Sequence, residues 1–160
     1  MSCSEKDFME IWEAIGRGLY PGVSFGLDGE HSFTPQGASK LLSDIRPKIK
    51  ELMERKKMVA ALHAEIERYA LLGIDTQESL QKAATLDQLV DGMTKKIAEL
   101  EDFGVVIKDL DYGLVDFPAE RYGEKVLLCW KYGEPEVIYW HKPLEGFSGR
   151  KPLRIQAIQP

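Results

Sequence analysis

Residues 71–78 read Leu-Leu-Gly-Ile-Asp-Thr-Gln-Glu and predict the point at which the chain turns back on itself. Gly73 supplies a helix stop, and Asp75 is placed as a new N-cap with Glu78 completing a capping box. On both sides of this turn, apolar residues recur at three- and four-residue steps, the spacing of one helical face. The pattern predicts a long antiparallel helical hairpin over residues 33–103.

The first helix has a strong start, because Thr34 can cap it and Pro35 suits the first helical position. Pro47 is expected to bend it. Its apolar stripe consists of Ala38, Leu41, Leu42, Ile45, Ile49, Leu52, Val59, Leu62, Ile66 and Tyr69. The stripe of the second helix consists of Leu86, Val90, Met93, Ile97 and Leu100, before a stop at Gly104. The two arms would extend about 55 Å and about 40 Å.

The two arms carry opposite charge. Residues 34–72 hold 8 basic and 5 acidic side chains, a net of +3, whereas residues 73–103 hold 3 and 7, a net of −4. This split favours pairing of the arms with each other or with a second copy, and arms of this length exceed what one small domain covers. We therefore expect a homodimer formed through the hairpin. A coiled-coil scaffold in a filament would need longer heptads than Lys56 and His63 allow.

After Gly104 the pattern changes to short apolar runs separated by turn residues. The expected strands are 105–107, 114–117, 126–130 and 137–140. Residues 104–160 therefore predict a small antiparallel β-meander, and the fold class is α+β. Before the hairpin, residues 1–32 form an extension with a short amphipathic helix and a glycine-rich loop. The apolar residues of that helix are Phe8, Ile11, Trp12 and Ile15.

The turn at Gly133-Glu134 predicts the register of the last two strands, in which Val126 faces His141. In that register His141 and Trp130 share one face of the meander, and Cys129 and Trp140 share the other. A nucleophilic Cys129–His141 pair is therefore not expected, and Cys129 is interpreted as a structural cysteine. Neither face is polar, so both must be covered.

Length and composition suit one domain over residues 1–160, with 44% hydrophobic and 29% charged residues. The N-terminus lacks a secretory signal, and the two cysteines form no disulfide framework, which indicates a cytoplasmic protein. The net charge of −5 argues against a nucleic-acid partner. The basic run Arg55-Lys56-Lys57 is interrupted by Glu51 and Glu54, so it is interpreted as a solvated helix face. No membrane association is expected.

The richest polar cluster lies in the meander: Asp116, Cys129, Glu134, Glu136, His141 and Arg150. One interpretation is a catalytic site in which His141 acts as a base, with Asp116 or Glu134 orienting it. Arg150 would hold an anion, helped by backbone N–H groups of the Gly146–Arg150 segment at Gly149. Trp130 and Trp140 are the further ligand-binding candidates. In the alternative interpretation, His141 is a histidine at a strand end with its hydrogen bonds satisfied by the protein, and Arg150 forms a salt bridge in a loop.

His63 and Glu67 stand four apart on the first helix, a spacing that can share a metal. No third ligand is nearby in the sequence, so an ordinary helix pair is the better interpretation. We expect no metal site, and the sequence predicts no particular cofactor.

Several short motifs resemble those of an uncharacterised bacterial family, domain of unknown function 2203. The first half contributes Phe33-Thr-Pro-Gln36 and Arg46-Pro47. The second half contributes Gly113-Leu-Val-Asp-Phe-Pro118, Leu128-Cys-Trp130, Gly133-Glu134, Trp140-His141 and Gly146-Phe-Ser-Gly-Arg150. The resemblance extends over roughly residues 33–153. It implies no particular reaction, substrate or cofactor.

From these patterns we expect a cytoplasmic, dimeric and non-catalytic binding or assembly module. Its meander would present a small polar site to a small anionic ligand or a partner chain. The rival is a hydrolase or transferase that uses His141 with Asp116 or Glu134 and anchors its substrate on Arg150. The geometry of the cluster distinguishes the two hypotheses. The enzyme requires the carboxylate and the imidazole to converge on one pocket within hydrogen-bond reach of each other.

Overall fold

The computed structural model describes residues 32–153, and the expected N-terminal helix lies outside these residues. Helices α2 (Pro35–Leu71) and α3 (Gln77–Asp102) come first. The strands are β1 (Val106–Asp109), β2 (Leu114–Arg121), β3 (Glu124–Lys131), β4 (Tyr139–His141) and β5 (Lys151–Pro152). A short 3-10 helix, η1 (Phe147–Gly149), precedes β5. The strands form one antiparallel sheet in sequence order, so the predicted α+β class is confirmed.

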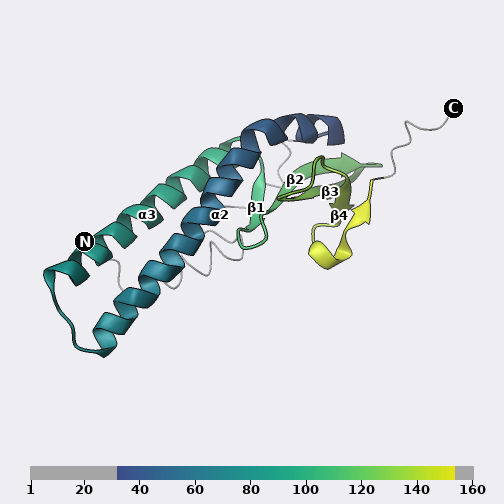
Figure 1. Cartoon of the computed structure of the whole chain (residues 1–160). Coiled ribbons are helices and arrows are strands. Elements are labelled where there is room, and N and C mark those ends of the chain that lie inside the picture. The colour runs from purple at the N-terminus through teal and green to yellow at the C-terminus, as the bar shows by residue number, and fades with distance from the viewer. Residues whose placement is uncertain (1–31, 154–160) are drawn as a thin grey trace.

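Helix α2 begins as the sequence predicts. The Thr34 side chain accepts a hydrogen bond from the Gly37 backbone N–H at 3.0 Å, and Pro35 occupies the first helical position. Pro47 lies inside the helix, which turns in its N-terminal third before it straightens (Figure 1). No helix within residues 32–153 has the length and apolarity that crossing a bilayer requires.

The cap of α3 differs from the prediction, because it is Thr76 rather than Asp75. Thr76 is extended, and its hydroxyl accepts from the Ser79 N–H at 3.2 Å. The Ser79 hydroxyl in turn accepts from the Thr76 N–H at 3.0 Å, so Ser79 fills the capping box in place of Glu78. The helix starts one residue later than expected because this threonine–serine pair satisfies two backbone donors at once.

This corrected cap gives the first testable prediction. Replacing Thr76 with alanine should lower the free energy of unfolding by about 1 kcal/mol, because it leaves the Ser79 N–H without its side-chain acceptor. Replacing the neighbouring Asp75 with alanine should change it by less than about 0.5 kcal/mol. Urea denaturation followed by circular dichroism measures both. A larger loss for the Asp75 variant would restore the original assignment.

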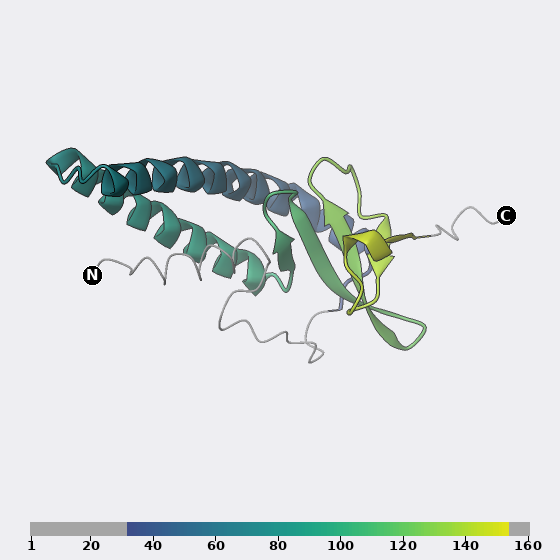
Figure 2. The same cartoon turned by 90° about the horizontal axis from the view of Figure 1, so that it is seen from below.

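The sheet lies at the open end of the hairpin, and the loop that joins the helices lies at the far end (Figures 1 and 2). Side chains from both helices and one face of the sheet form a single apolar core. Its sheet members in the two long strands are Val115, Phe117, Ala119, Val126, Leu128 and Trp130. The alternate residues of β2 and β3 therefore point to the opposite face, away from the helices.

A two-residue turn joins β2 to β3. Tyr122 and Gly123 both have positive φ, 51° and 77°, as a type I′ hairpin turn requires. The turn pairs Arg121 with Glu124 and, further along the ladder, Asp116 with Cys129. Asp116 and Cys129 are therefore direct cross-strand neighbours on the face away from the helices.

The predicted register of β3 and β4 is wrong by one residue. His141 pairs with Leu127 and Tyr139 with Cys129, whereas the sequence pattern placed His141 opposite Val126. A tight turn forms at Lys131–Glu134, where the Glu134 N–H donates to the Lys131 carbonyl at 3.0 Å, but the chain does not enter β4 directly from it. The Val137 N–H instead donates to the Ser39 hydroxyl of α2 at 3.0 Å. A shift of one residue moves every side chain of β4 to the other face. His141 therefore shares a face with Cys129, and Trp140 shares the face of Trp130.

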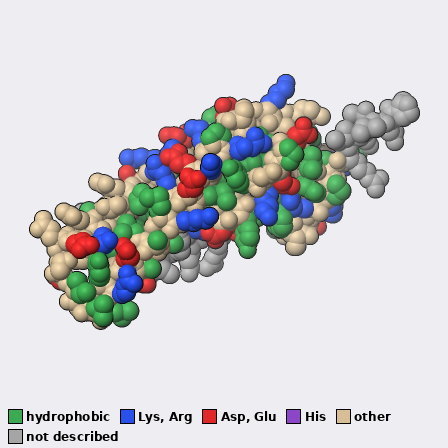
Figure 3. All heavy atoms as spheres, in the orientation of Figure 1, with side chains coloured by type: hydrophobic (Ala, Val, Ile, Leu, Met, Phe, Trp, Pro, Cys, Tyr) green, Lys and Arg blue, Asp and Glu red, His purple; other side chains and the backbone are tan. Residues whose placement is uncertain are grey.

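The hairpin extends beyond the sheet, and its distal half is only partly covered. The buried positions of α2 end at Val59, whereas Leu62 and Ile66 further along are only partly buried. The large side chains around the connecting loop are exposed, and Figure 3 shows hydrophobic atoms gathered at this tip. They are Leu71, Leu72, Ile74 and Leu80.

Ion pairs link the two helices of the hairpin. Three lysine–glutamate pairs link α2 to α3, with nitrogen–oxygen distances between 2.7 and 3.7 Å. They are Lys48–Glu99, Lys82–Glu65 and Lys96–Glu51. In Lys48–Glu99 the lysine comes from α2, the basic arm, but in the other two pairs α3 supplies the lysine. The ion pairs between the helices therefore do not follow the net charges of the arms.

Candidate functional site

The face of the sheet turned away from the helices carries three chemically active side chains close together. Asp116 comes from β2, Cys129 from β3 and His141 from β4. All three are buried, and one ligand-type atom of each lies within 4.8 Å of the others. Cross-strand pairing brings Asp116 and Cys129 together, and the observed register of β4 adds His141.

Both ring nitrogens of His141 are engaged. Nε2 lies 3.0 Å from Asp116 Oδ2, and Nδ1 lies 2.8 Å from the backbone carbonyl oxygen of Lys142. A carbonyl oxygen only accepts, so Nδ1 carries a proton. Burial opposes protonation of the ring, but the hydrogen bond and negative charge of Asp116 outweigh it and raise the pKa of His141. The other oxygen of the carboxylate, Oδ1, is buried and has no hydrogen-bond partner among the described residues.

Cys129 is held as a neutral thiol. Burial, and after it the nearby Asp116 carboxylate, raises the pKa of Cys129 to about 12, although the Arg150 guanidinium opposes this. A thiol with this pKa is a poor nucleophile. The face assignment that separated Cys129 from His141 is wrong, but the chemistry of the thiol still disfavours a cysteine hydrolase.

A pocket of about 100 Å³ opens over this cluster. Its walls come from β1, β2, β3, β4 and the segment 145–147 that follows β4. The lining residues are Lys108, Leu114, Asp116, Cys129, His141, Glu145, Gly146 and Phe147. Glu145 is fixed at the wall because its carboxylate accepts from the Lys142 N–H at 3.1 Å and from the Lys151 ammonium at 3.2 Å. The carboxylate–imidazole pair thus converges on a concave site.

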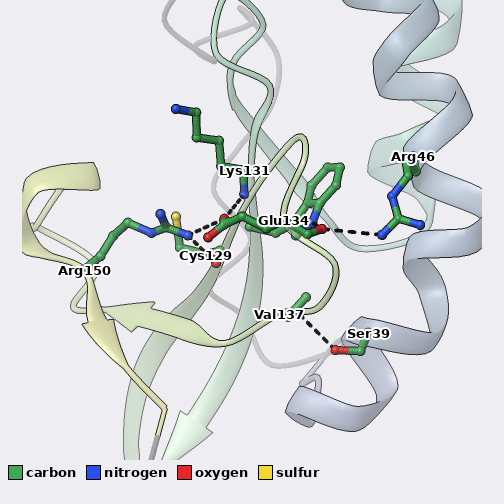
Figure 4. Close-up of polar contacts among 8 residues, drawn as sticks. Ser39, Arg46, Cys129, Lys131, Glu134, Val137 and Arg150 are labelled. Carbon is green, nitrogen blue, oxygen red and sulfur yellow. Dashed lines mark hydrogen bonds and ion pairs between the residues drawn. The ribbon is translucent and has the colours of Figure 1, made fainter.

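Glu134 and Arg150 lie together, but they are not among the residues that line this pocket. The Glu134 carboxylate accepts from Arg150 and from the Lys131 backbone N–H, and its carbonyl accepts from the Trp130 indole at 2.8 Å. Figure 4 shows Glu134 between Arg150 on one side and Arg46 of α2 on the other. Glu134 organises the β3–β4 connection, and its carboxylate neutralises the guanidinium that the sequence interpretation assigned to an anion.

The remaining ligand candidates are also placed elsewhere. Trp130 and Trp140 lie on the helix side of the sheet, where Trp130 is fully buried and Trp140 packs beneath the cations of Arg121 and Lys151. Gly149 ends η1, where its backbone N–H donates to the Gly146 carbonyl at 2.9 Å. A side chain at this position would collide with Glu145, so Gly149 permits the segment to fold closely.

The helix candidates form ordinary pairs. His63 Nε2 lies 3.8 Å from Glu67 Oε1, and no third metal-ligating side chain joins them within residues 32–153. In the basic run, Arg55 pairs with Glu51, whereas Lys56 is buried and pairs with Asp111 at 2.7 Å. Lys56 therefore connects α2 to the turn after β1.

Sequence reasoning grouped Asp116, Cys129 and His141 in one polar cluster and offered Asp116 as a partner of His141, but it placed Cys129 on the opposite face from His141. The Tyr122-Gly123 turn was a usable signal, because a two-residue hairpin loop already implies the Asp116–Cys129 pairing. The position of His141 had no such signal, since the seven residues 132–138 between β3 and β4 do not fix a register.

Comparisons with known proteins identify a family but no characterised relative. A profile of the family described as "Uncharacterized conserved protein (DUF2203)" matches residues 31–153. No curated protein and no solved structure matches the chain.

Proposed function

Since the chain belongs to the DUF2203 family, which has no described activity, we propose its function from the geometry: a cytoplasmic, non-catalytic binding module that works as a dimer. The pocket on the outer face of the meander holds a small anionic ligand. The hairpin pairs with a second copy of the chain.

The buried Asp116–His141 pair at the floor of the pocket supports the ligand site most strongly. The two residues are only 1% and 3% exposed. Burying such a pair costs several kcal/mol of desolvation, which apolar residues at the same positions would avoid. Convergent polar groups at the floor of a pocket are typical of a binding site. Lys108 in the wall supplies a positive charge that suits an anion.

Native mass spectrometry of the full chain, purified without chelators, tests the ligand site. Wild-type protein should retain a small molecule of defined mass. Leu114 lines the pocket, so Leu114→Trp should fill it and abolish retention without altering the polar cluster. Leu144→Trp is the matched control, because Leu144 is fully exposed outside the pocket. Equal retention by the Leu114→Trp variant, or none by wild type, would reject the ligand site.

The distal hairpin supports the dimer. Two helices alone cannot cover both sides of their apolar stripes, and Leu72 and Leu80 are 66% and 65% exposed at the tip. A second copy laid along the distal half would cover these side chains and the partly buried Leu62 and Ile66. Exposed clusters of this kind are typical of interaction surfaces.

The double variant Leu72→Glu, Leu80→Glu should be a monomer, because it places like charges on a face that becomes buried in the dimer. Sedimentation velocity at micromolar concentration measures this, with Leu144→Glu as the control that stays dimeric. Wild-type protein that sediments as a monomer at the same concentration would reject the dimer.

One observation favours a second candidate, a hydrolase or transferase. The Asp116 carboxylate and the His141 imidazole are 3.0 Å apart and both line the pocket. With both ring nitrogens of His141 engaged, Asp116 Oδ1 would be the atom that exchanges a proton with the substrate. Arg150 is engaged by Glu134, so Lys108 would have to hold the substrate. Phosphate-ester and carboxylate-ester substrates turned over by wild type but not by His141→Gln would support this candidate. Equal turnover by both proteins would reject it.

A further inference from the structure

We propose that Asp116, Cys129 and His141 are the ligands of a divalent transition-metal ion of the zinc class, bound at the floor of the meander pocket. The inference rests on the proposed function and deepens it, because the anionic ligand would bind at the coordination position that the three side chains leave open.

The three donor atoms already lie close to a coordinating arrangement. Donors on one tetrahedral zinc ion, at bond lengths of about 2.0–2.3 Å, are separated by roughly 3.3–3.8 Å. His141 Nε2 and Asp116 Oδ2 are 3.0 Å apart, and all three donors fall within 4.8 Å. They project from three adjacent strands, so small side-chain rotations bring them onto one ion without moving the backbone.

The surroundings of His141 orient it as a metal ligand. Its Nδ1–H donates to the Lys142 carbonyl at 2.8 Å, which fixes the ring and directs Nε2 toward Asp116 and Cys129. Metal-binding histidines in proteins are commonly held by this type of hydrogen bond from the other ring nitrogen. The Lys142 carbonyl therefore orients the His141 ring in the way that an outer-shell hydrogen-bond acceptor orients a metal-binding histidine.

One oxygen of the Asp116 carboxylate at the floor of the pocket makes no hydrogen bond to the described residues. Asp116 is 1% exposed, lines the pocket, and its Oδ1 has no hydrogen-bond partner among the described residues. Buried carboxylate oxygens are normally paired, and leaving one without a partner is costly. A cation in the pocket would supply that partner.

The donor set indicates which kind of cation. A thiolate and an imidazole select zinc-class ions over magnesium or calcium, which prefer oxygen ligands. Asp116 and the Cys129 thiolate together balance the two positive charges, so the buried site is neutral when the thiol proton is released to solvent. Three protein ligands with one open position are typical of zinc sites that bind a further ligand. The pocket of about 100 Å³ has room for it.

Cobalt substitution tests the site in the full chain. Protein freed of metal by a chelator and titrated with Co²⁺ should bind one ion per chain, with a thiolate-to-cobalt charge-transfer band and tetrahedral visible bands. Zn²⁺ should displace the ion. Cys129→Ser should abolish the charge-transfer band and weaken Zn²⁺ binding at least ~100-fold. Cys3→Ser and His63→Gln are the matched controls and should bind as wild type does.

Absence of the charge-transfer band in wild type overturns the proposal, and so does a band that survives in Cys129→Ser. The wild-type spectrum decides even where a variant does not fold. The proposed function fails separately: Leu114→Trp leaves the three ligands in place, so it should bind Co²⁺ while it loses the small molecule. Retention of the small molecule by wild type that binds no Co²⁺ would overturn the metal site alone.

Discussion

Replacing His141 with leucine is expected to lower the free energy of unfolding by about 3–5 kcal/mol in the presence of a chelator. The variant leaves the Asp116 carboxylate buried without the ring that is hydrogen-bonded to its Oδ2 at 3.0 Å. Its other oxygen already has no partner among residues 32–153. Asp116 is 1% exposed, so the carboxylate stays largely buried at the floor of the pocket after the ring is lost. Chemical denaturation followed by circular dichroism measures the loss.

The double variant His141→Leu, Asp116→Leu should recover most of that stability, since no charge then remains buried. Lys95→Leu is the control, because it removes the cation of the exposed Lys95–Asp91 pair and should change stability by less than about 1 kcal/mol. A double variant as unstable as the single one would show that the pair contributes through its shape and not through its charge. If the double variant recovered its stability but no longer retained the ligand, the pair would be shown to serve ligand binding and not folding.

Replacing Trp130 with alanine is expected to lower the free energy of unfolding by a similar amount, about 3–5 kcal/mol, for a different reason. Trp130 is fully buried in the core between the sheet and the helices, and its ring meets Tyr132 edge-on at 6.1 Å. Truncation leaves a large cavity at the point where α2 packs on the sheet. The same denaturation experiment measures the loss.

Trp130→Phe separates the volume of the ring from its hydrogen bond. Phenylalanine fills most of the space but leaves the Glu134 carbonyl without the indole N–H that donates to it at 2.8 Å. We expect a smaller loss, about 1–3 kcal/mol. If both variants lost the same amount, the hydrogen bond and not the packing would dominate at this position.

The helical hairpin could be predicted from the sequence because its signals are local. Thr34 and Pro35 mark the start of α2, and two apolar stripes with helical spacing mark the buried faces. The one local error, the cap of α3, arose because Asp75 and Thr76 are both good capping residues. Only the backbone conformation, with Ser79 three residues after Thr76, decides between them.

The site was predicted in its residues but not in its arrangement. Asp116 and His141 stood out as polar groups among apolar strands, yet which face His141 occupies depends on one residue of register. That register is set by contacts distant in the sequence, in which Ser39 of α2 takes the Val137 N–H and Arg46 contacts the Glu134 and Pro135 carbonyls. No pattern within the strands contains this information.

Each strand of the sheet pairs with the strand next to it in sequence, and the two helices pair across a short loop. Most of the fold can therefore assemble from contacts between neighbouring segments, which favours rapid folding in the order of synthesis. The contacts that join α2 and the residues just before it to the sheet are the exceptions, among them those from Ser39 to Val137 and from Phe33 to Pro118. During synthesis on the ribosome, the start of α2 must wait until Val137, about a hundred residues later in the chain, has been made before its hydrogen bonds to the sheet region are complete.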